Sequence, residues 1–241
     1  MEPDTTGSTG RRQPPSTEYT GPVVVTTLEF GESAVKVVRP AEPDRLLDDP
    51  VVRDWNQSDD YMPYRAYLWP GARLLAEVVA REPWLGCGPG QEPPCALEIG
   101  CGVGLAGLIA LERGLRVHFT DYDLAPLRFV ERSIRENGFD PTRCVTGRVD
   151  WRQPPDLSFP IILGSDVLYE RRLVPLVANL LAAMLEPGGQ GLIACPGRTS
   201  AESFPDAVRS RGLSCQAEPV ASATDDHQFV SGVVYRIRRK A

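Results

Sequence analysis

Residues 97–105 read Leu-Glu-Ile-Gly-Cys-Gly-Val-Gly-Leu, and this stretch decides the fold. The apolar run Ala96–Ile99 leads into three alternating glycines, and a helical pattern begins at Leu105. Glycine adopts the left-handed conformations and close approaches that a tight strand-to-helix turn requires. The stretch therefore predicts a strand, a glycine-rich turn and a helix whose N-terminus is free to face a ligand.

The same alternation continues on both sides of this turn. Apolar residues at helical spacing predict a helix from Pro70 to about Glu82. A turn at Pro187-Gly188-Gly189 is expected to end the helix before it. The remaining elements are expected as strands over 96–99, 116–120, 144–149, 161–164, 191–195, 213–218 and 230–236, and helices over 105–113, 126–137, 172–185 and 201–211.

This order predicts an α/β fold with a doubly wound, Rossmann-like, mostly parallel seven-stranded sheet. No helical pattern separates the last two strands, so they must form a hairpin. The last strand is therefore expected to run antiparallel to the others.

The residues before this alternation form an extension. Residues 1–20 are rich in Thr, Gly and Pro, and this composition predicts a disordered tail. Two β-branched runs, Val23–Phe30 and Ala34–Val38, flank a short turn and predict a β-hairpin. A short helix is expected within 45–55. We therefore expect an N-terminal extension over 21–68 that acts as a lid, and the main domain over 69–241.

Composition excludes several classes of protein. The chain has 241 residues and a net charge of −6, which disfavours a broad basic face for nucleic acid. The six cysteines lie apart without a CxxC pair, so no metal site is expected. Neither a secretory signal nor an apolar run of about 18 residues is present, and a cytoplasmic protein without a membrane segment is expected. The sequence specifies no oligomeric state.

The glycine turn alone fits two classes of cofactor. Residues 102–107 also read as the GxGxxG motif of nicotinamide oxidoreductases, and Asp121 would hold ribose hydroxyls in either class. Three features favour S-adenosylmethionine. The Glu98 carboxylate suits a cationic ammonium and would repel a pyrophosphate. Asp150 and Trp151 follow the third strand, where they could accept from an exocyclic amine and cover adenine. The antiparallel last strand is typical of methyltransferases.

With these residues in place, the chain resembles the seven-β-strand protein methyltransferases of the methyltransferase-like lysine methyltransferase group. The resemblance covers roughly residues 67–236. It implies a class I S-adenosylmethionine-dependent methyltransferase domain over 69–241, acting on a lysine side chain of a protein. The motifs that carry it are Leu68–Ala72, Leu97–Leu105, Phe119–Asp123, Asp150-Trp151 and Ile162–Glu170.

By this resemblance, Trp69 would flank the cofactor, Asp121 would hold its ribose, and Trp151 would pack on its adenine. Ser165 would touch the cofactor from the end of the fourth strand. The full set of expected cofactor-binding residues is Trp69, Glu98, Gly100, Cys101, Gly102, Gly104, Asp121, Tyr122, Asp123, Asp150, Trp151 and Ser165. One position departs from the pattern, because Ser133 stands where most relatives have an asparagine.

Asp166 and Tyr169 match the Asp-x-x-Tyr motif that these lysine methyltransferases place beside the acceptor. A carboxylate at the carboxyl end of a parallel strand lies in the crevice where such sheets bind ligands. The two residues are therefore the expected catalytic pair, with Asp166 steering an ammonium and Tyr169 offering a π face or a hydroxyl. In a purely structural alternative, Asp166 caps the following helix and Tyr169 is a core residue.

Three other functions remain open at this point. The aromatic segment 61–67 would also suit a lid over a small-molecule acceptor. A nicotinamide oxidoreductase and a non-catalytic cofactor-binding protein are the others. Binding of S-adenosylmethionine rather than NAD separates the oxidoreductase from the rest.

Overall fold

The sheet is built outward from β3 (Cys95–Ile99), the strand that precedes the glycine turn. The computed structural model describes residues 18–59, 67–86, 90–224 and 228–240. Within them the seven strands run in the order β5-β4-β3-β6-β7-β9-β8. The strands other than β3 are β4 (Arg116–Asp121), β5 (Cys144–Arg148), β6 (Phe159–Ser165), β7 (Leu185–Cys195), β8 (Leu213–Ala223) and β9 (Phe229–Arg239).

Strand directions confirm the predicted topology. Each neighbouring pair from β5 to β7 is parallel, whereas β9 lies antiparallel between β7 and β8. The sheet order reverses at β3, because the chain moves from β3 to β4 and β5 on one side and then returns to β6 on the other. Such a switch point places the carboxyl ends of β3, β4 and β6 around a common crevice.

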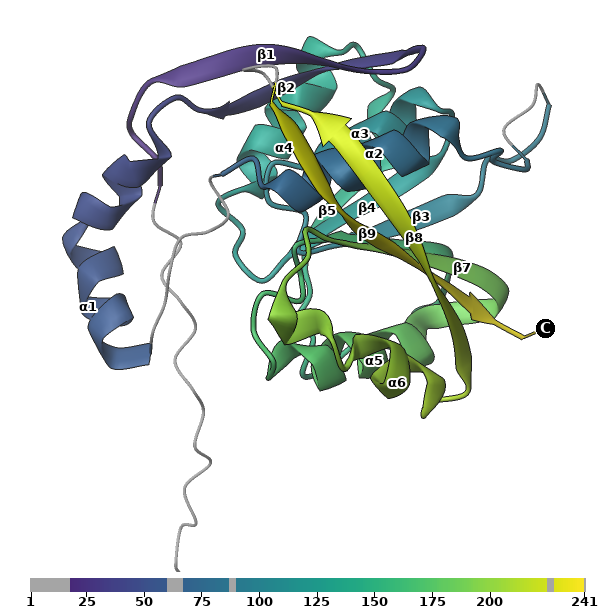
Figure 1. The fold of residues 1–241 in the computed structure, drawn as a ribbon. Helices are drawn as coiled ribbons and strands as arrows, with labels where there is room; N and C mark the ends of the chain where they lie inside the picture. The colour runs from purple at the N-terminus through teal and green to yellow at the C-terminus, as the bar shows by residue number, and fades with distance from the viewer. Residues whose placement is uncertain (1–17, 60–66, 87–89, 225–227, 241) are drawn as a thin grey trace, which may run out of the picture.

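Helices cover both faces of the sheet (Figure 1). One face carries α2 (Pro70–Arg81), α3 (Leu105–Glu112) and α4 (Leu127–Glu136), and the other carries α5 (Leu173–Met184) and α6 (Phe204–Arg209). The consecutive α3 residues Leu105 to Leu111 are all buried, as expected of a helix covered on every side. The α3 helix is therefore a core element that carries the glycine turn at its N-terminus.

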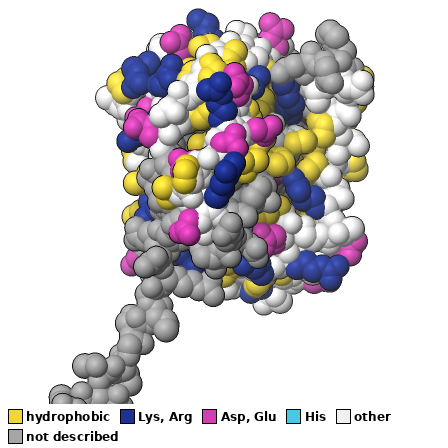
Figure 2. All heavy atoms as spheres, turned by 90° about the vertical axis from the view of Figure 1, so that its left-hand side faces the viewer, with side chains coloured by type: hydrophobic (Ala, Val, Ile, Leu, Met, Phe, Trp, Pro, Cys, Tyr) yellow, Lys and Arg dark blue, Asp and Glu magenta, His cyan; other side chains and the backbone are white. Residues whose placement is uncertain are grey.

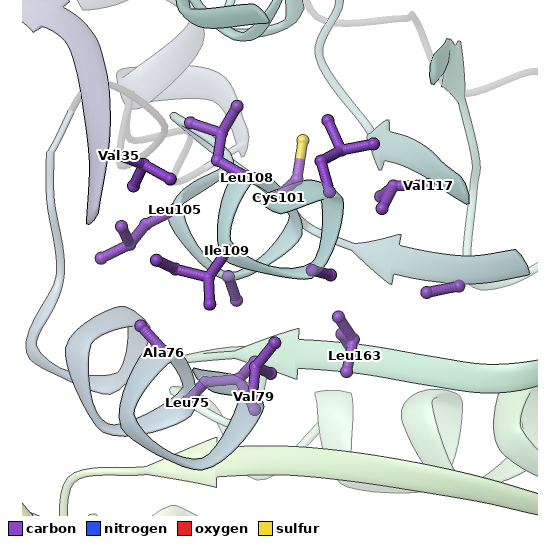
Figure 3. Close-up of a cluster of buried hydrophobic side chains, with 14 of the residues drawn as sticks. Val35, Leu75, Ala76, Val79, Cys101, Leu105, Leu108, Ile109, Val117 and Leu163 are labelled. Atoms are coloured by element: carbon purple, nitrogen blue, oxygen red, sulfur yellow. The ribbon is translucent and has the colours of Figure 1, made fainter. Parts of the chain in front are cut away.

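Apolar side chains lock α3 against its neighbours. Figure 3 shows Leu75 and Val79 of α2 pointing toward Ile109 of α3, with Leu163 of β6 close by. All four side chains are fully buried. Burying a large aliphatic side chain stabilises the fold by roughly 1.5–3 kcal/mol. The site built on the glycine turn thus rests on a rigid layer.

The N-terminal hairpin packs over α3 and α4, confirming the prediction for this segment (Figure 1). Strands β1 (Val23–Phe30) and β2 (Ser33–Pro40) pair antiparallel. The free edge of β2 is bound by α4: the Ser133 hydroxyl accepts the Val38 N–H at 2.8 Å. Just after this helix, the Asn137 side chain accepts the N–H of Lys36 and donates to its carbonyl. Two polar side chains thereby replace a third strand.

The structure differs from the predicted elements at several boundaries. The helix expected within 45–55 is two helices, the 3₁₀ helix η1 (Pro43–Asp48) and α1 (Pro50–Asp59), separated where Asp49 precedes a proline. The helix expected over 201–211 is a 3₁₀ turn, η4 (Thr199–Ala201), followed by the short α6.

The predicted turn at 187–189 is wrong as a boundary, because it lies inside β7. Leu185 already pairs with Phe159, and the register then shifts so that Gln190 pairs with Ile161. The Pro-Gly-Gly sequence is therefore an irregularity within the strand, which absorbs extra residues as a bulge does.

Part of the predicted tail belongs to the folded extension. The Tyr19 hydroxyl donates to the Pro22 carbonyl at 2.9 Å, and the Glu42 N–H donates to that hydroxyl at 3.2 Å. Residues 1–17 and the aromatic segment at 61–66 lie outside the described residues. Within the described ranges, no helix has the length and apolarity to cross a bilayer.

Candidate active site at the carboxyl edge of the sheet

The glycine turn after β3 depends on three left-handed residues. Gly100, Gly102 and Gly104 have φ values of 58°, 52° and 78°. A Cβ on Gly104 would lie 2.8 Å from a Val130 methyl, and one on Gly100 would lie 2.9 Å from the Trp151 ring. Both the backbone conformation and the space therefore require glycine. Gly100 and Gly102 are half-buried at the switch point of the sheet, so the turn is partly open to solvent there.

Asp121 ties the end of β4 to this turn. One carboxylate oxygen accepts the Gly102 N–H at 3.0 Å, and the other accepts the Asp123 N–H at 3.0 Å. Asp123, itself buried, accepts the Ala125 N–H at 2.8 Å. Two of the predicted cofactor-binding segments are thus brought together by a carboxylate that serves both.

Glu98 of β3 is buried against α3. Its carboxylate is 1% exposed and accepts the Gly107 N–H of α3 at 3.1 Å. Burial raises the pKa of Glu98 to about 8, the Gly107 hydrogen bond opposes the rise, and nearby Asp121 adds to it. Cys101 is also buried beneath the turn. Both side chains are buried in the structure, and the contacts that the sequence predicts for them with the cofactor stay predictions.

Trp151 supplies the apolar wall of the crevice. Its ring lies against Gly100, and its indole nitrogen is buried with no hydrogen-bond partner in the described part of the chain. A buried donor without an acceptor is unusual in a folded protein. The glycine backbone, the aromatic wall and this donor together fit the nucleoside of S-adenosylmethionine better than a purely structural turn.

Two arginines that the sequence analysis missed cover this side of the crevice. Arg152 binds the Asp150 carboxylate through Nη2 at 2.6 Å and donates to the Tyr122 hydroxyl at 3.0 Å. Arg148 and Arg152 both lie 5.3 Å from the centroid of the Tyr122 ring. The hydrogen bond from Arg152 lowers the pKa of Asp150. The predicted adenine-side residues are therefore pre-ordered by cations.

Asp166 is the central residue at the end of β6. Among the described residues it is the one non-glycine with a positive φ, 54°. Its carboxylate is largely buried, with Oδ2 accepting the Gly71 N–H at 2.7 Å and Oδ1 accepting from Arg198 Nη2 at 3.0 Å. Burial raises the pKa of Asp166, and both partners oppose the rise.

The helix capped by Asp166 is α2, which precedes the glycine turn. A Cβ on Gly71 would lie 2.3 Å from Asp166 Oδ2, so only glycine admits the carboxylate. The expectation that a structural Asp166 would cap the following helix is wrong, because the contact joins residues 95 positions apart. The carboxylate bridges two segments at the edge of the sheet.

A row of side chains connects Asp166 to the N-terminal extension. The Arg198 guanidinium lies 5.8 Å from the Trp69 ring, and Trp69 packs 5.4 Å from the Tyr67 ring. The Tyr67 hydroxyl donates to Asp44 in η1, and burial together with this carboxylate raises the pKa of Tyr67 to about 12. The sequence placed Trp69 here but missed Arg198, since its partner lies 32 residues away.

The remaining predicted residues lie on the same edge. Ser165 is the last residue of β6, and Tyr169 follows in an irregular segment before α5. The Tyr169 residue is 38% exposed, so it is not a core residue. The structure therefore brings the candidate catalytic pair and the glycine turn to one edge, with Tyr169 facing solvent.

The fold and this edge define a Rossmann-like, class I methyltransferase domain. The 16S rRNA N2 G1207 methyltransferase of T. thermophilus, solved with AdoMet and guanosine, is similar with a TM-score of 0.58 and 17% identity over 91% of this chain and 51% of that chain. A ribosomal protein L11 methylase from Lactobacillus delbrueckii is similar with a TM-score of 0.53 and 15% identity over 69% of this chain and 77% of that chain.

The chain belongs to the lysine methyltransferase family, whose model matches residues 64–208. It is 28% identical over 144 residues to the protein N-lysine methyltransferase METTL21A of Xenopus tropicalis, covering 58% of this chain. It is 35% identical over 103 residues to a histidine protein methyltransferase 1 homolog of Dictyostelium discoideum, covering 41% of this chain. The chain spans 61% and 33% of the lengths of these relatives. Family membership confirms the predicted class and its cofactor, S-adenosylmethionine.

Proposed function

We propose that the chain methylates a lysine side chain of a protein, using S-adenosylmethionine. The observation that carries the proposal is the pairing of a buried carboxylate, Asp166, with an exposed Tyr169 at the edge where the glycine turn opens. Family membership supports the same chemistry. An acceptor side chain can approach this edge from solvent, where Tyr169 is exposed.

In this proposal the cofactor lies over the glycine turn. Gly100 and Gly102 approach its methionine part through their backbone, Asp121 binds its ribose hydroxyls, and Trp151 packs on its adenine. Trp69 and Ser165 flank the reacting end. These roles follow from the family pattern and from the places that the residues take along one edge of the sheet.

The protein must position the acceptor and supply it in the right protonation state. When bound, S-adenosylmethionine supplies a methyl group already activated by its sulfonium, and S-adenosylhomocysteine remains after the transfer. A lysine nitrogen must stand in line, about 3 Å from the methyl group. It must first lose a proton to water, which costs roughly 5 kcal/mol at neutral pH. A site beside the cofactor must therefore favour the neutral amine.

The surface near this edge suits a protein acceptor. Figure 2 shows Lys and Arg side chains interspersed with Asp and Glu and with apolar groups on the face that lies at the left of Figure 1. A nucleic-acid enzyme usually presents a continuous basic face instead. We also propose that the extension at 21–68 takes part in choosing the substrate, since η1 contacts Tyr67 beside the site. The cytoplasmic location stays a prediction.

Labelling with S-adenosylmethionine tests the acceptor. The purified chain is incubated with the methyl-labelled cofactor and a cell lysate, and labelled protein bands are hydrolysed for amino-acid analysis. We expect label in methyllysine. Label in methylhistidine would contradict a lysine acceptor and favour a histidine acceptor, as the name of the Dictyostelium relative indicates. Label confined to small molecules would contradict a protein acceptor altogether.

A further inference from the structure

A cation stands between Asp166 and the solvent. The Asp166 side chain is 8% exposed, whereas that of Arg198 is 33% exposed. One Asp166 oxygen is bound by the Gly71 N–H, and the other is bound by Arg198 Nη2 at 3.0 Å and Nε at 3.3 Å. An ammonium group approaching this carboxylate from outside therefore meets a guanidinium first.

The position of Arg198 is fixed from a second side. Its guanidinium lies over the Trp69 ring, 5.8 Å from the centroid, at the residue that precedes α2. A cation held by both a carboxylate and an aromatic face loses much of its freedom. Arg198 is thus a built part of the site, although no motif in the sequence pointed to it.

Within the residues that the structure describes, the charged or titratable groups on the elements packed around the pair are engaged by other partners or uncharged. From β7, the buried Cys195 thiol faces both members, and burial raises its pKa. From α2, Arg73 donates to the Ala223 carbonyl at 3.2 Å. From the segment after β6, Glu170 pairs with Arg172. The local field at Asp166 is therefore governed by its own ion pair with Arg198.

We propose that Arg198 keeps the acceptor amine in its neutral, nucleophilic form by cancelling the charge of Asp166. The inference rests on the proposed lysine acceptor and assigns to Arg198 the role of a positioning and electrostatic residue. A lone carboxylate beside the amine would stabilise the ammonium, whose nitrogen has no lone pair to donate. A neighbouring cation has the opposite effect and favours loss of the proton.

The atoms balance without any further reactant. The acceptor ammonium releases its proton to water before transfer. Its lone pair then forms the nitrogen–carbon bond as the carbon–sulfur bond breaks, and the sulfur keeps the electron pair of that bond. The Asp166–Arg198 pair gains and loses nothing; it sets the fraction of acceptor that is neutral at a given pH.

Single-turnover rates of methyl transfer to the protein acceptor found by labelling, measured between pH 6 and 10, test this role. They report the protonation state of the acceptor amine in the complex. In Arg198→Met the midpoint of the rate profile should rise by about one pH unit, which lowers the rate about tenfold on the acidic side. Arg198→Lys keeps the positive charge and should keep the midpoint. Asp166→Asn keeps an oxygen for the Gly71 N–H but leaves Arg198 unpaired, so its midpoint should fall.

The decisive result is a midpoint that rises in Arg198→Met and falls in Asp166→Asn. A merely structural role would lower the rate by one factor at every pH and leave both midpoints unmoved, and that result would overturn the inference. Affinity for S-adenosylhomocysteine and melting temperature serve as controls. If Arg198→Met fails to fold, Asp166→Asn and Arg198→Lys still carry the comparison.

The methylated residue that the wild-type chain produces distinguishes failure of this inference from failure of the proposed function. If the wild-type product is methyllysine and the midpoints do not move, only the role of Arg198 falls. If the wild-type chain yields no methyllysine, the lysine acceptor is wrong, and the role assigned to Arg198 falls with it.

Discussion

Asp121 binds the protein's own backbone through both carboxylate oxygens, at Gly102 and Asp123. The same carboxylate is the proposed ligand of the ribose. Asp121→Ala should therefore weaken S-adenosylhomocysteine binding by about 10- to 100-fold, since a charge-assisted hydrogen bond contributes roughly 1.5–3 kcal/mol. Calorimetry measures the affinity, and a melt of the free protein measures the cost to the fold.

Asp140→Ala is the matched control for this substitution. The Asp140 carboxylate accepts the N–H of Thr142, two residues ahead, at 2.9 Å, just as Asp121 accepts that of Asp123. It lies at the start of the 3₁₀ helix η3 (Pro141–Arg143), which leads into β5. Its loss should leave the affinity unchanged. Equal affinities for wild type and Asp121→Ala would show that the ribose lies elsewhere.

Glu98 gives the fold a pH dependence of predictable sign. Its pKa is raised from 4.5 to about 8 in the folded state, so the folded protein holds a proton that the unfolded chain releases. The contribution of Glu98 to the free energy of unfolding is therefore fully present below about pH 4.5. It falls as the pH rises toward 8, by roughly 1 kcal/mol per pH unit. Urea denaturation from pH 5 to 9 measures this slope.

Glu98→Gln isolates that contribution. Glutamine still offers an oxygen to the Gly107 N–H but does not titrate. The variant should lack the component of the slope that the wild type shows between pH 5 and 8. Identical slopes in the two proteins would mean that Glu98 is ionised in the folded state.

Tyr169 should affect turnover without affecting the fold. Because it is exposed and stands three residues after Asp166, Tyr169→Phe removes only a hydroxyl from the acceptor side. We expect methylation to slow by about 10²-fold, within the range for a positioned acid, base or hydrogen-bonding group. S-adenosylhomocysteine affinity should stay within about twofold of the wild type by the same reasoning. A normal rate in Tyr169→Phe would remove the hydroxyl from the mechanism.

At the scale of elements, the hairpin β1–β2 depends on side chains of α4 and the residue after it. Ser133 is fully buried, accepts the Val38 N–H and donates to the Phe129 carbonyl at 2.8 Å each. Ser133→Ala leaves a buried N–H unpaired and should cost about 1–3 kcal/mol. Urea denaturation measures the loss, and faster hydrogen exchange at Val38 should locate it.

Ser214→Ala is the control for that experiment, because its exposed hydroxyl makes a long 3.4 Å contact to the Arg238 carbonyl. It should change stability by less than about 0.5 kcal/mol. If Ser133→Ala changes the free energy of unfolding as little as Ser214→Ala does, the Ser133 hydroxyl does not hold the hairpin in solution.

The element pattern was readable from the sequence because local features dictate it. Apolar periodicity marks α2, and the alternating glycines mark the turn between β3 and α3. The bulge at 186–189 was unreadable, since a Pro-Gly-Gly run signals a turn whether it ends a strand or interrupts one. Only the pairing of Phe159 with Leu185 distinguishes the two cases.

The candidate site was readable only in part. Residues within motifs, such as Asp121 and Asp166, follow strands and were found from spacing. The partners of Asp166, Gly71 and Arg198, lie 95 and 32 positions away from it, and no local pattern joins them to it. The contact forms because the carboxyl ends of β6 and β7 are adjacent in the sheet. The contacts of Asp166 with residues distant in the sequence therefore required the structure.

For the whole molecule, cofactor binding should raise the melting temperature. A ligand at 100 times its dissociation constant stabilises the folded state by about 2.7 kcal/mol. For a chain of this size that corresponds to roughly 5–10 °C. S-adenosylmethionine and S-adenosylhomocysteine should each produce the shift, and NAD should produce none. A rise in melting temperature with NAD alone would indicate that the glycine turn binds a nicotinamide cofactor, as in the oxidoreductases.

The place of β9 between β7 and β8 also dictates an order of assembly. The ribosome makes β8 before β9, yet β8 joins the sheet only through β9. A nascent chain therefore carries an open β7 edge until residues 229–239 emerge, and such edges pair readily with other chains. The α2 helix packs against both late strands, and Arg73 and Glu77 of α2 bind Ala223 and Ser222 of β8. The helix that receives Asp166 thus gains its full support only after β9 is made, so translation of this hairpin sets when the edge that carries Asp166 is completed.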